Sequence, residues 1–149
     1  MRPDEGLGWQ LDFSKLHQIA RDGYQVVPVV IQHIGSGEVL MLGYMNQDAL
    51  QHTMTLKEVV LFSTSRGSIW HKGLESGNRI KVASIWVNCE QNSLLIKGIP
   101  LQKGVCHTKN SIGEYRTSCY FRELVEWPPI LTNGESPPSG VNQDNSSEY

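Results

Sequence analysis

The three cysteines are the feature that most restricts how this chain can fold. Cys89, Cys106 and Cys119 lie in the second half of the sequence, and His107 follows the middle cysteine. Three thiolates leave one tetrahedral position on Zn²⁺ open, which is the arrangement of a catalytic zinc site. Such a site requires all three sulfur atoms to reach one ion. Cys106 and Cys119 can approach each other across a loop, whereas Cys89 has to come from a distant turn or from a second subunit.

Two other interpretations of these residues remain open at this point. The spacing of the cysteines is not that of a paired CxxC motif, and cysteines of cytosolic proteins are often small buried apolar residues. His107 can be a fourth metal ligand, a surface histidine, or a general acid or base, since an ordinary imidazole exchanges protons near neutral pH. The residues alone do not decide between these roles.

Composition excludes several classes of protein. The chain has 149 residues, which predicts one domain, and its net charge of −2 gives no electrostatic reason to expect binding to nucleic acid or to an anionic membrane. No apolar run is long enough to span a membrane, and the first residues lack the apolar core of a signal peptide. We therefore expect a cytosolic protein, where an odd number of free thiols is normal.

The pattern of apolar residues predicts a mainly β domain between a flexible arm and a disordered tail. The arm is residues 1–10, the domain residues 11–127, and the tail the Pro-, Ser- and Asn-rich residues 128–149. Within the domain we predict a short helix capped by Asp12 and a second helix capped by Asn46, with Ala49, Leu50 and Met54 facing inward. Strands are predicted at residues 26–34, 39–45, 58–63, 79–87, 93–99 and 119–125.

A polar loop at residues 65–78 is a candidate ligand site. It combines hydroxyls, cations and an aromatic ring, a set suited to a phosphate and a planar base. On composition alone an ordinary exposed loop is the alternative. With the preceding strand end, the candidate binding residues are Ser63, Ser65, Arg66, Trp70, Lys72, Ser76 and Gly77.

Taken in order, these segments resemble the phosphoribosyl-AMP cyclohydrolase family. The resemblance covers roughly residues 11–124, and its most specific parts are the run Val39-Leu40-Met41…Tyr44-Met45-Asn46 and the pair Trp70-His71-Lys72-Gly73 and Ser76-Gly77. Further matching segments are residues 30–32, 49–50, 62–66, 76–78, 106–108 and 118–122.

The resemblance implies an α+β fold, mainly antiparallel sheet with a few short helices, in an intertwined homodimer. It implies zinc held by Cys89, Cys106 and Cys119 across the dimer interface, and Mg²⁺ held by an Asp-Cys-Asp-x-Asp motif. The implied reaction is hydrolysis of the adenine N1–C6 bond of phosphoribosyl-AMP in histidine biosynthesis, giving the formimino-carboxamide ribonucleotide. His107 would shuttle protons, while Arg66, Lys72, Ser76 and Gly77 would hold phosphate and ribose.

The chain departs from the family pattern at several positions. Asn88, Glu90 and Asn92 replace the three aspartates, so three formal negative charges fall to one and a magnesium site should be weak or absent. Thr64 replaces an arginine, and His33 and Leu74 replace acidic residues. The gap between Cys106 and Cys119 is also longer than in the family pattern Cys-His-Thr-Gly-x-x-Ser-Cys.

These departures leave three hypotheses for the function. The first is a zinc-dependent phosphoribosyl-AMP cyclohydrolase. The second is a paralogue that hydrolyses another purine-like nucleotide. The third is a non-catalytic zinc-binding dimer that recognises a nucleotide, although retention of His107 argues against a purely structural site.

Overall fold

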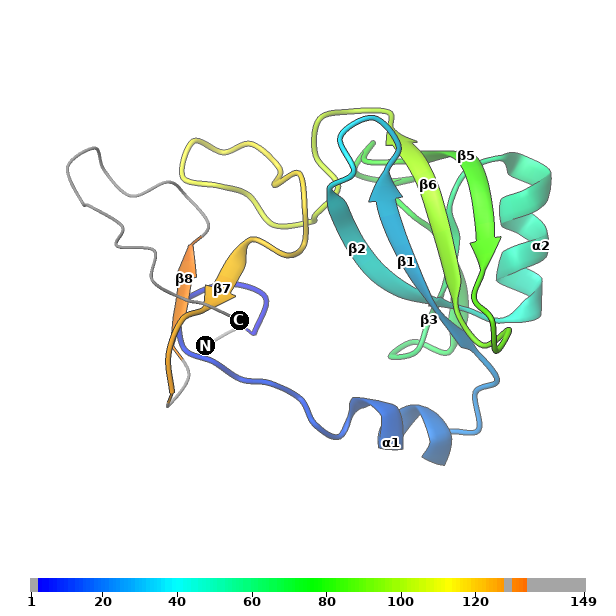
Figure 1. Ribbon diagram of the computed structural model, residues 1–149, viewed down its shortest axis with the longest axis horizontal. Helices are drawn as coiled ribbons and strands as arrows, with labels where there is room; N and C mark the ends of the chain where they lie inside the picture. The colour runs from blue at the N-terminus through cyan, green and yellow to red at the C-terminus, as the bar shows by residue number, and fades with distance from the viewer. Residues whose placement is uncertain (1–2, 128–129, 134–149) are drawn as a thin grey trace.

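A four-stranded sheet forms the centre of the protein, in a computed structural model that describes residues 3–127 and 130–133. Its strands are β1 (Val27–His33), β2 (Val39–Met45), β5 (Ile80–Val87) and β6 (Leu94–Pro100), in the order β2-β1-β6-β5 (Figure 1). The pairs β1–β2 and β5–β6 are antiparallel, which confirms both predicted hairpins. β1 and β6 pair in parallel, a long-range contact for which the sequence gives no local signal.

The helix α2 (Gln47–Leu56) begins where the sequence predicts. The Asn46 side chain accepts a hydrogen bond from the backbone N–H of Ala49 at 2.8 Å, as expected of an N-cap residue. The buried Thr53 hydroxyl bonds to both backbone groups of Val60 and thereby attaches the helix to β3 (Val60–Ser63). The prediction that Met54 faces inward is wrong, because its side chain is 54% exposed, whereas Ala49 and Thr53 are the buried residues of the helix.

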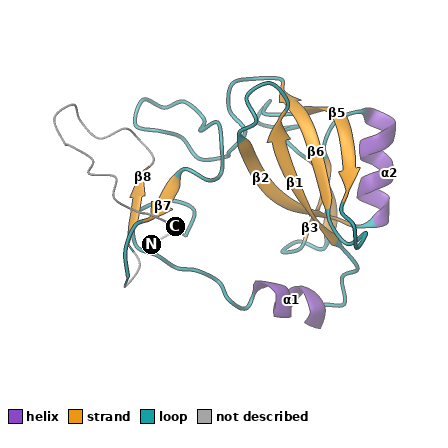
Figure 2. Ribbon diagram, in the orientation of Figure 1, coloured by secondary structure: helices purple, strands orange, loops and turns teal. Residues whose placement is uncertain are grey.

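The core lies between the sheet, α2 and β3. Side chains from all six of these elements, including Val29, Ile31, Leu61 and Ile96, are at most 2% exposed. β3 forms a short antiparallel hairpin with β4 (Ser68–His71), a strand inside the segment predicted to be a polar loop. The described residues form mainly strands with two short helices (Figure 2), which confirms the predicted α+β fold.

The predicted alternation of inward-facing and outward-facing side chains along β5 holds for its first half. Ile80 is fully buried and Val82 partly buried, but the pairing with β6 shifts register between Val82 and Ser84. A register shift of this kind reverses the faces of the residues that follow it. Trp86, predicted to share the face of Ile80, is therefore 55% exposed and donates its indole N–H to Ser84.

The N-terminal helix α1 (Lys15–Arg21) starts after the residue predicted to cap it. The Asp12 carboxylate accepts hydrogen bonds from the backbone N–H and the hydroxyl of Ser14, and this local turn delays the helix. The hydrogen bonds with Ser14 also lower the pKa of the Asp12 carboxyl. The helix ends at Arg21 with Asp22 as its C-cap, and among its own residues it buries Ile19.

The C-terminal part differs from the prediction in two places. The strand predicted at residues 119–125 is reduced to β7 (Arg122–Leu124), because the preceding residues are held in a loop around Cys119. β8 (Leu131–Asn133) pairs with β7, so these three residues of the predicted disordered tail form a strand. Residues 128–129 and 134–149 of the predicted tail lie outside the described residues.

The described helices are all too short or too polar to cross a membrane. The flexibility predicted for residues 1–10 stays a prediction, but two of the described residues of this arm are fastened to β7. The Arg122 guanidinium donates hydrogen bonds to the carbonyl oxygens of Pro3 and Gly6 at 3.0 and 2.9 Å. The arm thereby passes close to the functional residues described next.

Candidate metal centre and active site

The loop that carries Cys119 is attached to the start of β2. The backbone N–H of Cys119 donates to the carbonyl of Leu40 at 2.7 Å, and the Ser118 hydroxyl donates to the carbonyl of Val39 at 2.8 Å. The Thr117 hydroxyl donates to the carboxylate of Glu38. Three consecutive residues therefore bond to the beginning of one strand, and this fixes where the thiol of Cys119 stands.

The segment around Cys106 is held by the residues that precede Cys119. The carbonyl oxygen of Arg116 accepts hydrogen bonds from the backbone N–H groups of Val105 and Cys106, both at 3.0 Å. Gly104 permits this close approach, because a Cβ at its position would lie 2.3 Å from the Cβ of Tyr115. The chain therefore folds back on itself between Gly104 and Arg116 and brings Cys106 to Cys119.

The thiols of Cys106 and Cys119 lie side by side. Cys106 is 3% exposed, and its sulfur lies 3.0 Å from the hydroxyl of Thr108. The hydrogen bond with Cys119, and next to it that with Thr108, lowers the pKa of Cys106 to about 5. The same contact raises the pKa of Cys119, which acts as the donor. A thiolate beside a second thiol is the start of a soft-metal ligand set.

Lys72 lies beside this pair and is buried, at 5% exposed. Its ammonium donates to the carbonyl oxygens of Val105 at 2.6 Å and Asn78 at 3.2 Å, and burial lowers its pKa. The sequence predicted that this ammonium binds substrate. That role stays a prediction, but two of its donors are committed to the backbone next to Cys106, where its charge favours the thiolate form of both cysteines.

Cys89 lies far from the other two cysteines in the same chain. It is exposed in the turn between β5 and β6, next to Leu94, whereas Cys119 adjoins Leu40 of β2. Through the register of β6, β1 and β2, Leu94 and Leu40 lie two strands apart and near opposite ends of the sheet. From the spacing between strands and the rise along them, Cys89 and Cys119 are about 15–20 Å apart. In keeping with this, the described residues contain no cluster of three metal-ligating side chains.

The residues around Cys89 do not fit a magnesium ion. The Asn88 side-chain oxygen accepts hydrogen bonds from the backbone N–H groups of Asn92 and Ser93, and its amide nitrogen donates to the Asn92 side chain at 2.7 Å. Asn92 in turn donates to Glu90 at 3.1 Å. Mg²⁺ requires free hard oxygen ligands, usually carboxylates, and here one carboxylate is present and the amides bond to each other.

The predicted substrate residues fall into two groups. Ser63, Ser65 and Arg66 meet at the turn of the β3–β4 hairpin, where the Ser63 hydroxyl bonds to the Ser65 hydroxyl and accepts the Arg66 N–H. The second group, Lys72, Ser76 and Gly77, lies past the other end of the hairpin. The half-exposed ring of Trp70 lies 5.9 Å from the Lys72 ammonium and belongs with this second group.

His107 stands at the surface beside the thiol pair. Its side chain is 74% exposed, and its Nε2 lies 2.8 Å from the carboxylate of Asp4 in the N-terminal arm. An exposed imidazole oriented by a carboxylate is suited to pass a proton. Asp4 was not foreseen, since a contact between residues so far apart leaves no trace in the sequence.

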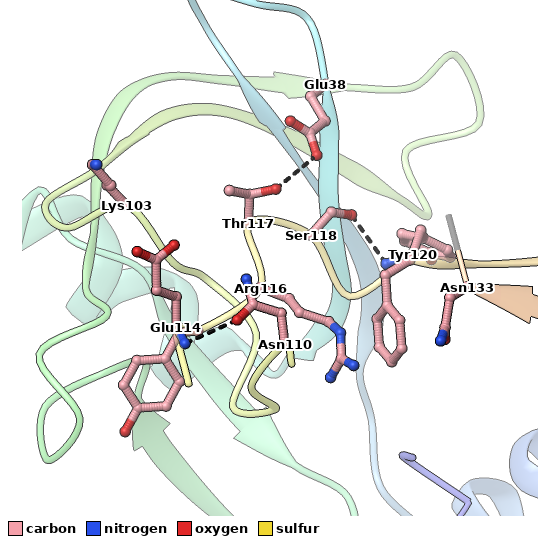
Figure 3. A pocket seen from close by; sticks show the side chains of 11 residues that line it. Glu38, Lys103, Asn110, Glu114, Arg116, Thr117, Ser118, Tyr120 and Asn133 are labelled. Carbon is pink, nitrogen blue, oxygen red and sulfur yellow. Dashed lines mark hydrogen bonds between the residues drawn. The ribbon is translucent and has the colours of Figure 1, made fainter. Parts of the chain in front are cut away.

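A pocket of about 360 Å³ opens beside Cys119 (Figure 3). The loop between the second and third cysteines forms one wall of it. This loop closes on itself through the Asn110 side chain, which accepts the backbone N–H groups of Ile112 and Glu114. The pocket is lined by Glu38, Lys103, Asn110, Glu114–Ser118, Tyr120, Phe121 and Asn133.

Fold and site together define a class: an α+β protein with a thiol pair, a neighbouring histidine and an adjacent pocket. Comparison with known proteins identifies its family. The model of the phosphoribosyl-AMP cyclohydrolase family matches residues 41–121, and the chain belongs to this family. The matched region contains all three cysteines, His107 and Lys72.

Curated relatives agree with this assignment. The phosphoribosyl-AMP cyclohydrolase of Cupriavidus necator is 41% identical over 121 residues, which cover 77% of this chain and 86% of the relative. The enzyme of the same name from a Janthinobacterium species is 35% identical over 81% of this chain and 92% of the relative. The histidine biosynthesis bifunctional protein HisIE of Staphylococcus epidermidis is 44% identical over 93% of this chain but 58% of its own length.

Proposed function

We propose that this protein hydrolyses the adenine N1–C6 bond of phosphoribosyl-AMP in histidine biosynthesis. The oxygen of water becomes the carboxamide oxygen at C6. The N1–C6 bond breaks, and N1 keeps its electron pair and takes up a proton, which gives the formimino-carboxamide ribonucleotide. The observation that carries this proposal is the Cys106–Cys119 pair with His107 beside it, inside the region that matches the family.

Zinc is the metal that the residues fit. Two sulfur ligands are preassembled, and the proposed third is Cys89 of a second subunit. When bound, zinc would supply the Lewis acidity that activates water at neutral pH. The side chains of this chain would do the rest: Thr108 and Lys72 hold the thiolates, and His107 carries the proton toward N1 while Asp4 orients its ring. No magnesium step is included, because the Asn88 turn does not fit that ion.

A homodimer is part of the proposal. The position of Cys89, exposed and remote from its proposed partners, supports a site completed by a second chain. Exposed apolar side chains in and just before α1 and in the C-terminal segment also support it, since a contact between subunits would bury them. These include Phe13 at 86%, Leu16 at 70% and Trp127 at 85% exposed. We further propose a cytosolic location, in keeping with its free thiols.

Substrate contacts remain proposals for both groups of predicted residues. The half-exposed Trp70 ring is available to stack on the base, and the Ser63, Ser65 and Arg66 turn offers hydroxyls and one cation. Ser76 offers a hydroxyl, whereas the Gly77 N–H already donates to the carbonyl oxygen of Gly73 at 2.8 Å.

Turnover of phosphoribosyl-AMP by the purified, zinc-replete protein tests the proposal. We expect ring opening, followed by the absorbance of the product, and its loss in Cys106→Ala. His107→Asn should lower kcat by about a hundredfold while zinc content stays unchanged, in the range usual for loss of a general acid–base. His17→Asn, an exposed histidine on α1, is the matched control and should have no effect. Absence of turnover in zinc-replete protein with added Mg²⁺ would contradict the proposal.

One observation favours the second hypothesis, a paralogue with a different purine-like nucleotide as substrate. The loop between Cys106 and Cys119, which is longer than in the family pattern, supplies Asn110, Glu114 and Tyr115 to the pocket. A preference for another nucleotide over phosphoribosyl-AMP, measured as a higher kcat/KM, would support this candidate.

A further inference from the structure

Arg116 differs from Arg79 and Arg122, whose side chains have hydrogen-bond or ion-pair partners in the structure. Arg79 pairs with Glu58 at 3.2 Å, and Arg122 donates to two carbonyl groups of the N-terminal arm. The Arg116 guanidinium makes no hydrogen bond or ion pair within the described chain, and its Nη1 is buried without an acceptor. A buried charged donor without a partner is costly, so this position is suited to an anion that arrives from outside.

The guanidinium is nevertheless held in place. Its carbon lies 4.0 Å from the centre of the Phe121 ring. The backbone of Arg116 is fixed as well, because its N–H donates to Thr108 and its carbonyl accepts from Val105 and Cys106. A cation fixed by stacking and by backbone bonds loses little conformational freedom when it binds an anion.

The charges along the pocket are separated. Two carboxylates line it, Glu38 and Glu114, and so do two cations, Lys103 and Arg116. Figure 3 shows Glu114 near Lys103 and Glu38 beside Thr117, while the Arg116 guanidinium points away from both carboxylates, toward the side of Tyr120 and Asn133. Glu38 also accepts the Thr117 hydroxyl. The end of the pocket that contains Arg116 therefore combines a free cation with amide and aromatic side chains and no carboxylate.

We propose that Arg116 is the cationic anchor of a subsite for a phosphate monoester. Asn110 and Asn133 offer amide donors beside it, and a planar guanidinium can donate two parallel hydrogen bonds to phosphate oxygens. This differs from the resemblance, which assigns phosphate to Arg66 and Lys72, since the Lys72 ammonium already bonds to two carbonyl oxygens. The assignment of this phosphate to the nucleotide being hydrolysed rests on the proposed function.

Binding of ribose 5-phosphate, measured by titration calorimetry, tests the subsite without any turnover. Arg116→Gln should weaken its binding by about tenfold to a hundredfold, the range for loss of a charge-assisted hydrogen bond. Arg21→Gln removes the same charge from α1 and is the matched control, expected to bind like wild type. Ribose without phosphate should bind equally to wild type and Arg116→Gln.

Kinetics then separate this inference from the proposed function. With phosphoribosyl-AMP, Arg116→Gln should raise KM by a similar factor at nearly unchanged kcat, and Arg116→Lys should recover part of the loss. If Arg116→Gln binds ribose 5-phosphate more weakly than wild type but wild type does not turn over phosphoribosyl-AMP, the subsite would be upheld and the proposed substrate refuted. Normal ribose 5-phosphate binding and KM in Arg116→Gln would overturn the subsite, whatever the turnover. If Arg116→Gln does not fold, Asn133→Ala, which removes an amide beside the guanidinium, serves as the second variant: a threefold to tenfold loss of ribose 5-phosphate binding supports the subsite, and no loss overturns it.

Discussion

The two regions that contain the cysteines are built in opposite ways. In the Cys106–Cys119 region Cys106 is buried and Cys119 exposed, and the region is held by hydrogen bonds to the start of β2, to the Arg116 carbonyl and to the Lys72 ammonium. The Cys89 region is an exposed hairpin turn whose polar side chains bond mainly to each other. One region is therefore set by the fold of a single chain, while the other presents its thiol outward. In the proposed function, the first region would preassemble part of a metal site and the second would complete the site of another chain.

The largest expected effect is loss of the metal on removal of a thiol from either region. Cys106→Ser and Cys89→Ser should each reduce zinc from about one ion per chain to near zero and abolish turnover, because a site with two thiolates binds zinc far less tightly. Metal analysis by mass spectrometry checks this. Retention of zinc in Cys89→Ser would remove that cysteine from the site.

The Cys106→Ser and Cys89→Ser variants should also differ in stability when both proteins are metal-free. Cys106 is 3% exposed and bonded to Thr108, so its replacement should lower the free energy of unfolding by about 1–2 kcal/mol. Cys89 is exposed, and its replacement should stay within about 0.5 kcal/mol of the unchanged protein. Urea denaturation in the presence of a chelator provides both values.

Removal of zinc should next weaken the dimer. If the ion joins the two regions across subunits, part of its binding free energy stabilises the assembly. Sedimentation at a series of protein concentrations should show a dissociation constant that rises at least tenfold on chelation. An equally tight dimer without zinc would place the three ligands in some other arrangement.

Lys72→Met tests the rigidity of the first region. It leaves the carbonyl oxygens of Val105 and Asn78 without their donor, which should cost about 2–4 kcal/mol in the free energy of unfolding. Lys81→Met, on the exposed face of β5, is the control and should cost less than about 0.5 kcal/mol. Equal stabilities of the two variants would show that the Lys72 ammonium does not hold the Cys106 segment.

The smallest effect concerns magnesium at the second region. The unchanged protein should show no shift in melting temperature with added Mg²⁺, because the Asn88 and Asn92 amides bond to each other. Replacing both by aspartate places three carboxylates in one turn, which should lower the melting temperature by a few degrees and let Mg²⁺ restore it. A magnesium response in the unchanged protein would contradict the hydrogen-bonded turn.

Much of the fold was predictable because its signals are local. The caps and alternating runs predicted the β1–β2 and β5–β6 hairpins and the start of α2. The register shift in β5 and the parallel pairing of β1 with β6 were not predictable, since both depend on partners distant in sequence. The short apolar run Ile130-Leu131-Thr132 was overlooked within a polar tail, although it contains part of β8.

The site was predictable in its residue types but not in its geometry. The cysteines, His107 and Lys72 were all singled out from the sequence, yet burial of Lys72 follows from the backbone carbonyls around it. Thr108 and Ser118 belong to the quoted motifs, and their adjacency to the cysteines was the available signal. Arg116 and Asp4 gave none, because their roles arise from a stacking contact and a long-range contact.

Subunit mixing tests the central claim most directly. Cys89→Ser and Cys106→Ser chains are each expected to be inactive alone. In a mixed dimer one of the two shared sites would keep Cys89 from one chain and the Cys106–Cys119 pair from the other. The account predicts that unfolding and refolding the two variants together restores zinc and turnover, up to about a quarter of wild type for random pairing of chains. No recovery, in mixtures shown by mass spectrometry to contain mixed dimers, would contradict a zinc site shared between subunits.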